Sequence, residues 1–203
     1  MTHLFIDTSS VLIVGLLSDQ YQWVAYNLIE EEKSASKLHY LVYEMCETHN
    51  MSINDIESVI AVNGPGSYTG MRVSEGFLQT SKLMGKTIYS FYHFDVPRLL
   101  LMDRGVWVTH AFKGEYFLHC WENSKIEQHL VKETAIENEL EKYSNIFTQN
   151  KKVKRVGEFP NIQYSSDLVR QNPKDIFLGV LRDKMERAPF YFRPDHVEFK
   201  TCF

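Results

Sequence analysis

The stretch Asn63-Gly64-Pro65-Gly66-Ser67-Tyr68-Thr69-Gly70-Met71-Arg72 carries the strongest structural signal in this chain of 203 residues. An apolar run precedes it and a segment with helical periodicity follows it. This order predicts a strand, a tight loop, and a helix whose first turn exposes backbone N–H groups. The glycines permit tight turns and close approach to another surface, and Thr69 is the expected N-cap. Arg72 opposes the helix dipole, so we expect an anionic group to compensate it, with Asp7 as a candidate.

Segments of strand and helix periodicity continue on both sides of this loop. In the first half, strands are predicted at 4–6, 12–17, 22–28, 58–62 and 87–90, and helices at 36–49 and 71–84. A second series follows, with strands at 106–111, 115–121, 126–131 and 146–148, and helices at 135–142 and 173–187. Both series open with a three-strand meander. We therefore expect an α/β protein of two related lobes, 1–103 and a smaller 104–203, with the tail 189–203 packing back on the first lobe.

The two helices of the first lobe are amphipathic, and their outer sides predict a surface for a partner protein. On the 36–49 helix the inward stripe is Leu38, Leu41, Val42 and Met45, and on the 71–84 helix it is Val73, Phe77, Thr80 and Met84. The outward side chains that we expect to bind the partner are Tyr40, Tyr43, Met71, Ser74 and Leu78. Scattered surface apolarity is the alternative interpretation.

Composition narrows the possible functions. A net charge of −4 disfavours autonomous nucleic-acid binding, and the basic run at 151–155 is either a solvated face or an RNA contact within a larger assembly. No apolar run is long enough to span a bilayer, and we see no leader at the N-terminus, so we expect a cytoplasmic protein. Three widely spaced cysteines indicate reduced thiols.

The usual catalytic patterns do not occur. The eight histidines lack metal-ligand spacing, and the glycine-rich stretch is not a Walker motif. Ser67 lies at a predicted strand-to-helix bend but outside a Gly-x-Ser-x-Gly pattern, which disfavours a hydrolase. Asp7 either orients a nucleophile or hydrated cation, or caps the turn after the first strand.

Four segments together resemble the TsaB (YeaZ) family. The opening 4–10 is similar to the family's strand followed by Asp-Thr-Ser/Ala, and 63–72 matches its Gly-Pro-Gly-Ser-Phe/Tyr-Thr-Gly-Val/Met-Arg signature. Residues 113–116 resemble its second-lobe Arg-x-Gly-Glu-Val-Tyr segment, and 189–194 resemble its Pro-x-Tyr-Leu-Arg tail. The resemblance implies the two-lobed fold of actin-like ATPases and sugar kinases (ASKHA), with mixed sheets flanked by helices and a reduced second lobe.

The resemblance also implies a role. TsaB proteins are non-catalytic partners of TsaD, which forms threonylcarbamoyladenosine next to the anticodon of tRNAs that read codons starting with A. The expected partners are TsaD, TsaE together with TsaD, a second copy when the protein is alone, and tRNA only within the complex, with no membrane. No metal or cofactor is expected on this chain alone, and ATP or ADP could lie at the TsaD junction. The signature residues are expected to be structural: Asp7, Gly64, Pro65, Gly66, Ser67, Thr69, Gly70 and Arg72.

Some positions depart from the family pattern. His110 replaces a usual Asp, Glu75 replaces a usual aliphatic residue, the turn at 8–11 is poor in glycine, and only Gly157 lies near an expected adenosine loop. These departures weaken the alternative of an autonomous ATPase or sugar-kinase-like enzyme that uses Asp7 and the glycine loop. Two more functions stay open, a peptidase-like hydrolase and a module that only homodimerises.

Overall fold

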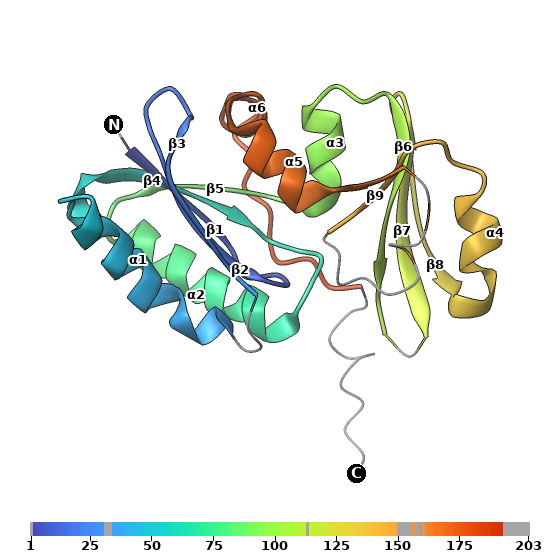
Figure 1. The fold of residues 1–203 in the computed structure, drawn as a ribbon, viewed down its shortest axis with the longest axis horizontal. Helices are drawn as coiled ribbons and strands as arrows, with labels where there is room; N and C mark the ends of the chain where they lie inside the picture. The colour runs from blue at the N-terminus through green and yellow to red at the C-terminus, as the bar shows by residue number, and fades with distance from the viewer. Residues whose placement is uncertain are drawn as a thin grey trace, which may run out of the picture. The chain divides into compact units, whose positions relative to one another are not determined.

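The computed structural model describes residues 2–30, 34–112, 114–149, 156, 159 and 161–192. The chain divides into two compact units (Figure 1): the first contains the residues through Tyr92 together with those from Phe177 on, and the second is His93–Ile176. The boundary therefore differs from the predicted division after residue 103. His93 and Phe94 belong to the second unit because their rings pack on Trp107. Phe177 belongs to the first unit because its ring packs on Phe5.

The first unit contains a five-stranded mixed sheet with the order β3-β2-β1-β4-β5. Its strands are β1 (Thr2–Asp7), β2 (Leu12–Leu17), β3 (Trp23–Ile29), β4 (Ile56–Val62) and β5 (Thr87–Phe91). The first three form an antiparallel meander, whereas β4 pairs in parallel with both β1 and β5. These are the five strands that the sequence predicts, because apolar β-favouring runs bounded by turn residues specify them locally.

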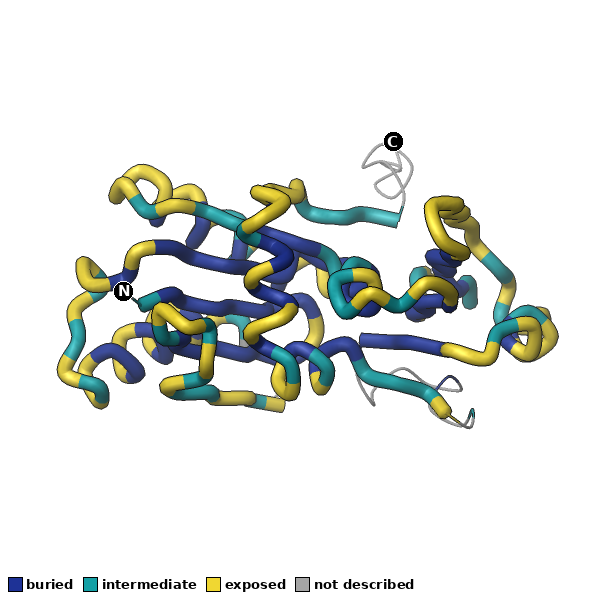
Figure 2. Tube along the Cα trace, turned by 90° about the horizontal axis from the view of Figure 1, so that it is seen from above, coloured by how far each residue is buried: buried dark blue, intermediate teal, exposed yellow. Residues whose placement is uncertain are grey.

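The two faces of this sheet bury different elements. Leu4 and Ile6 of β1 belong to a core cluster with α1 (Leu38–Thr48) and α2 (Tyr68–Leu83), which lie together on one face (Figure 1). Phe5, between them in the strand, packs on the opposite face. This division follows from the alternation of side chains along a strand. Figure 2 shows the central strands buried and their surroundings exposed.

Helix α1 has the predicted orientation, but helix α2 has it only in part, since Val73 and Phe77 pack against the core as predicted. Leu38, Leu41, Val42 and Met45 are all buried, as expected. On α2 the buried residues are Gly70, Met71, Ser74, Phe77, Leu78 and Ser81, whereas Thr80 and Met84 are exposed. The prediction that Met71, Ser74 and Leu78 face outward is wrong. The stripe of α2 that faces the sheet includes small residues, which allow the helix to pack closely on the sheet. A prediction based on large apolar residues does not detect these small residues and therefore places part of the stripe on the wrong side of the helix.

The second unit is also built on a five-stranded sheet, with the order β10-β9-β6-β7-β8. Its strands are β6 (Arg104–His110), β7 (Glu115–Glu122), β8 (Lys125–Lys132), β9 (Ile146–Thr148) and β10 (Ile162–Tyr164). Its helices are α3 (Val96–Leu99), α4 (Ile136–Leu140) and α5 (Ser165–Gln171), and α6 (Pro173–Arg182) crosses the boundary between the units. Short 3-10 turns occur at Ser34–Lys37, Ile53–Asp55, His93–Asp95 and Glu133–Ala135.

The predicted meander β6-β7-β8 is confirmed, and three short elements of this unit were not predicted: α3, β10 and α5. Helix α6 ends at Arg182, earlier than the predicted residue 187, and Lys184 has a φ of 46° that a helix cannot contain. Among the described residues, no helix combines the length and apolarity needed to cross a membrane. Cys46 and Cys120 are buried free thiols, and Cys202 lies outside the described residues.

His119 is a neutral histidine in the core of the second unit. It is 3% exposed, its ring stacks on Phe94 with centroids 4.2 Å apart, and its Nδ1 contacts Gln128 at 2.8 Å. Its Nε2 has no hydrogen-bond partner. Burial lowers the pKa of His119 to about 4, and the positive charge of Arg98 adds to this effect. The folded state therefore resists protonation of this ring.

We expect the second unit to lose stability in acid because of His119. A depressed histidine pKa contributes stability that is present above the unfolded value of 6.5 and is lost as the pH falls toward about 4. The difference corresponds to about 3 kcal/mol. The free energy of urea unfolding, measured from neutral pH to pH 4, should fall less steeply in His119→Phe than in the parent protein. The matched control is His129→Gln, which changes a partly exposed histidine on β8 and should retain the parent slope; equal slopes in the parent and His119→Phe would contradict the assignment.

Candidate functional site

The glycine loop connects the end of β4 to the start of α2. Ser67 is the N-cap of this helix, and its hydroxyl accepts a hydrogen bond from the backbone N–H of Gly70 at 3.3 Å. The prediction that Thr69 is the cap is wrong, because the helix begins at Tyr68 and Thr69 lies within its first turn. Gly64 has a φ of 100°, a conformation that favours glycine, and the Gly64–Pro65 peptide bond is cis.

The loop is packed against the turn between β1 and β2. The Thr8 hydroxyl donates to the Gly70 carbonyl oxygen at 2.7 Å, and the Ser67 backbone N–H donates to the Ser9 carbonyl oxygen. A Cβ atom on Gly66 would collide with the Ser9 carbonyl, and one on Gly70 would collide with the Thr8 carbonyl. Glycine is therefore required at both positions, where two backbones are in direct contact. We call this contact the loop–turn clamp.

Asp7 and Arg72 have their own roles beside the clamp. The buried Asp7 carboxylate accepts hydrogen bonds from the Ser9 backbone N–H at 2.8 Å and from the Ser9 hydroxyl, which is the turn-capping role considered for it. The Arg72 guanidinium donates to the Tyr68 hydroxyl at 2.8 Å and lies over the Tyr68 ring, 5.0 Å from its centroid. A direct ion pair between Asp7 and Arg72 stays a prediction.

A groove of about 750 Å³ lies between α1 and α2. Val42, Tyr43, Phe77 and Met84 contribute its apolar lining, and polar residues of the segment after α1 complete it. Tyr43 is 64% exposed, so its ring is available at the edge of this groove. The volume of the groove is within the range of ligand-binding sites.

The structure separates the five residues predicted to bind a partner. Tyr40 and Tyr43 are exposed on α1, as expected. Met71, Ser74 and Leu78 are buried and are not part of an exposed surface on which a partner helix could pack. Leu83 and Met84, at the C-terminal end of α2, are exposed instead. The predicted inward stripe of α2 included Met84 because of its apolarity and did not consider Leu83. Both residues are identified as exposed only when the rotational phase of the helix is known.

The final described segment, which we call the C-terminal strap (residues 185–192), packs on the first unit. The Met185 carbonyl accepts from Ser90 N–H at 2.8 Å, and Phe190 N–H donates to the Asn63 carbonyl at 2.9 Å. The Tyr191 ring lies 5.3 Å from that of Tyr68. The part of the predicted tail within residues 189–192 thus contacts the first unit, and the rest lies outside the described residues.

Several other positions named from the sequence can be located. His110 is exposed at the end of β6, and its ring meets that of Tyr116 edge-on. Glu75 accepts a hydrogen bond from Gln79 on the solvent side of α2. Lys113, the basic run 151–155, Gly157 and Arg193-Pro194 lie outside the described residues. No metal-binding group of three or more His, Cys, Asp or Glu side chains occurs in the part of the chain that the structure describes.

No family model and no curated protein matches the sequence significantly. Solved structures do match: an uncharacterised Pseudomonas aeruginosa protein with similarity to peptidase YeaZ has a TM-score of 0.63 at 15% identity, covering 95% of this chain and 99% of that one. YeaZ from the same organism has a TM-score of 0.62 at 15% identity, covering 94% of this chain and 99% of YeaZ. This chain has the YeaZ fold. The resemblance inferred from the four sequence segments is thus confirmed at the level of fold.

A third match extends the comparison to kinases. The Listeria monocytogenes protein Lmo2764, provisionally assigned as an N-acetylmannosamine kinase, matches with a TM-score of 0.51 at 9% identity, covering 91% of this chain and 100% of that one. The expected two-lobed actin-like and sugar-kinase fold is therefore confirmed. At these identities the likeness concerns the fold, and activity has to be argued from the chain's own residues.

Two glycines of α2 provide a matched test of the loop–turn clamp. Gly70→Ala should destabilise the protein by about 1–3 kcal/mol, because the new methyl group would overlap the Thr8 carbonyl. Gly76→Ala should instead stabilise it by about 1 kcal/mol, because Gly76 is exposed in mid-helix with no atom nearby. Denaturant unfolding of both variants measures the two changes. Equal effects of the two substitutions would show that the clamp imposes no steric requirement.

Proposed function

We propose that this protein is a cytoplasmic, non-catalytic partner of TsaD in the formation of threonylcarbamoyladenosine next to the anticodon of tRNA. The YeaZ fold, together with the signature at 63–72, is the observation that carries the proposal. TsaE joins through TsaD, and a nucleotide in the complex would lie at the TsaD junction. Contact with tRNA requires the assembled complex, which agrees with the net charge of −4.

The partner surface in this proposal is the outer side of α1 and the end of α2. Tyr40 and Tyr43 are 63% and 64% exposed, Leu83 and Met84 are exposed at the end of α2, and Tyr43 and Met84 line the same groove. Exposed aromatic side chains beside an apolar groove are typical of the energetic centre of an interface. TsaD would pack helices against this face and fill the groove lined by Val42, Phe77 and Met84. The same face would serve the homodimer when TsaD is absent.

The loop–turn clamp supports a role without autonomous ATP hydrolysis. A turn that binds phosphate oxygens does so through backbone N–H groups that are free to donate. Here the Ser9 N–H is bonded to Asp7, and the Ser9 carbonyl is bonded to Ser67. The Ser67 hydroxyl caps α2, a structural use that also accounts for this serine without peptidase chemistry. The remaining rival is a kinase-like enzyme that opens the clamp to bind nucleotide.

We expect Tyr43→Asp to abolish co-purification with TsaD, since it places a charge at the edge of the apolar groove. The measurement is size-exclusion chromatography of the mixed proteins, followed by reconstituted threonylcarbamoyl transfer to tRNA. Leu178→Asp is the matched control: it introduces the same charge at another exposed apolar position, on α6, and should leave both readouts unchanged. Thermal unfolding should show both variants folded, because both side chains are exposed.

Three results would each count against the proposal. One is an unchanged complex with Tyr43→Asp, which would remove the assigned face. Another is saturable ATP binding with turnover by the isolated chain that is lost in Asp7→Asn, which would favour the kinase-like rival. Transfer to tRNA that proceeds equally with and without this protein would exclude the activating role.

A further inference from the structure

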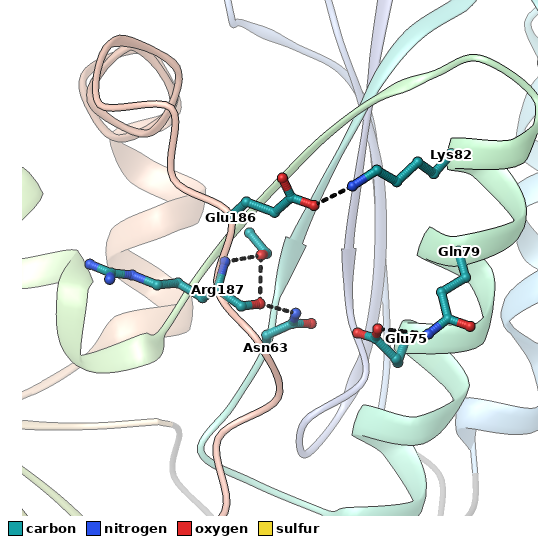
Figure 3. Close-up of polar contacts among 7 residues, drawn as sticks. Asn63, Glu75, Gln79, Lys82, Glu186 and Arg187 are labelled. Atoms are coloured by element: carbon teal, nitrogen blue, oxygen red, sulfur yellow. Dashed lines mark hydrogen bonds and ion pairs between the residues drawn. The ribbon is translucent and has the colours of Figure 1, made fainter.

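A second cavity of about 460 Å³ lies on the first unit, between the solvent side of α2, the end of β5 and the C-terminal strap. Leu78 and Ile88 give it an apolar floor, Ala188 is a further apolar lining residue, and the other lining residues are polar or charged. Figure 3 shows the polar side chains around it, from Asn63 at one side to Gln79 and Lys82 at the other. It shares no lining residue with the groove between α1 and α2.

One wall of this cavity holds an acceptor without a donor. The Asn63 side chain is 1% exposed, and its Nδ2 donates to the Arg187 carbonyl at 2.6 Å, which fixes the orientation of the amide. The Ser90 hydroxyl donates to the same carbonyl at 2.8 Å and accepts from Arg187 N–H at 2.6 Å. The Asn63 Oδ1 therefore cannot exchange places with Nδ2, and it has no hydrogen-bond partner. A buried amide oxygen left unpaired is costly, so this atom requires a donor from outside the chain.

The charges around the cavity define that donor. Glu75 accepts a 3.0 Å hydrogen bond from Gln79 Nε2 and has no ion-pair partner among the residues that the structure describes. Lys82 is neutralised by Glu186 at 2.7 Å. The Arg187 guanidinium lies over the Tyr92 ring, 5.7 Å from its centroid, and extends away from Glu75 in Figure 3. The Glu75 carboxylate is therefore left without a compensating cation in the described part of the chain, and it lies on the side toward which the Asn63 amide oxygen points in Figure 3.

We propose that this cavity binds a small organic cation with N–H donors, an aliphatic primary ammonium compound. Its N–H groups donate to Asn63 Oδ1 and to the Glu75 carboxylate, and its hydrocarbon part covers Leu78 and Ile88. A bare metal ion fits the cavity less well, because the Lys82 ammonium lies beside the second carboxylate. The site requires neither TsaD nor catalysis, so the inference is independent of the proposed function.

The test uses the full chain labelled with ¹⁵N and n-butylammonium chloride as the probe. We expect saturable shifts of the side-chain amide signals of Asn63 and Gln79, and about tenfold weaker binding in Glu75→Gln, which keeps the shape of the side chain but removes its charge. Glu137→Gln, which removes an exposed carboxylate from α4, is the control and should bind like the parent chain. Lys82→Gln should tighten binding, because it leaves Glu186 unpaired.

Two comparison probes make the outcome decisive. Tetramethylammonium has the same charge without N–H donors, and 1-butanol has a similar chain without the charge. If tetramethylammonium shifts the Asn63 signal as strongly as butylammonium, recognition is only by charge and the site is not the one proposed. If no probe gives a saturable shift, ordered water alone satisfies Asn63 and the proposal is wrong. Equal affinity of Glu75→Gln and the parent chain would also refute it.

Discussion

The loop–turn clamp is the contact on which the arrangement of the first unit depends. It joins the turn after β1 to the start of α2 through one hydrogen bond from the Thr8 hydroxyl and one between backbone groups, and so fixes the start of the helix relative to the sheet. Gly66 and Gly70 are needed because carbonyl groups occupy the space that a Cβ would take. In the same turn the Ser9 backbone N–H is bonded to the Asp7 carboxylate, so this N–H is not available to a phosphate oxygen in the described conformation.

The different sides of helix α2 contact different parts of the first unit. Its sheet-facing stripe, with small residues at Gly70, Ser74 and Ser81, allows close packing on the sheet. Phe77 and Met84 contribute to the groove shared with α1, whereas Glu75, Gln79 and Lys82 face the cavity beside the C-terminal strap. Glu75, a departure from the usual aliphatic residue of the TsaB pattern, thus lines the cavity for which we propose an ammonium ligand.

A structural feature could be predicted from the sequence where residues close together in the chain determine it. All strands of both sheets except β10, and the inward stripe of α1, were predictable because alternation and helical spacing are properties of contiguous residues. The orientation of α2 was not, because Ser74 and Ser81 face the sheet for their size and a hydrophobicity pattern ignores them. Short elements such as α3 have too few residues to show a period. The orphaned oxygen of Asn63 depends on a bond to Arg187, far along the chain, for which no local signal exists.

The place of Phe177 has a consequence for how the protein is made. Its ring fills the aromatic layer formed with Phe5, Trp23 and Phe91, yet it follows the whole second unit in the sequence. The amino-terminal sheet therefore emerges from the ribosome with one face still uncovered, while residues 93–176 are complete earlier than the unit that began first. The first unit therefore cannot complete its core until the segment that begins at Phe177 has been synthesised. A nascent chain arrested before Phe177 would expose the rings of Phe5, Trp23 and Phe91 to chaperones.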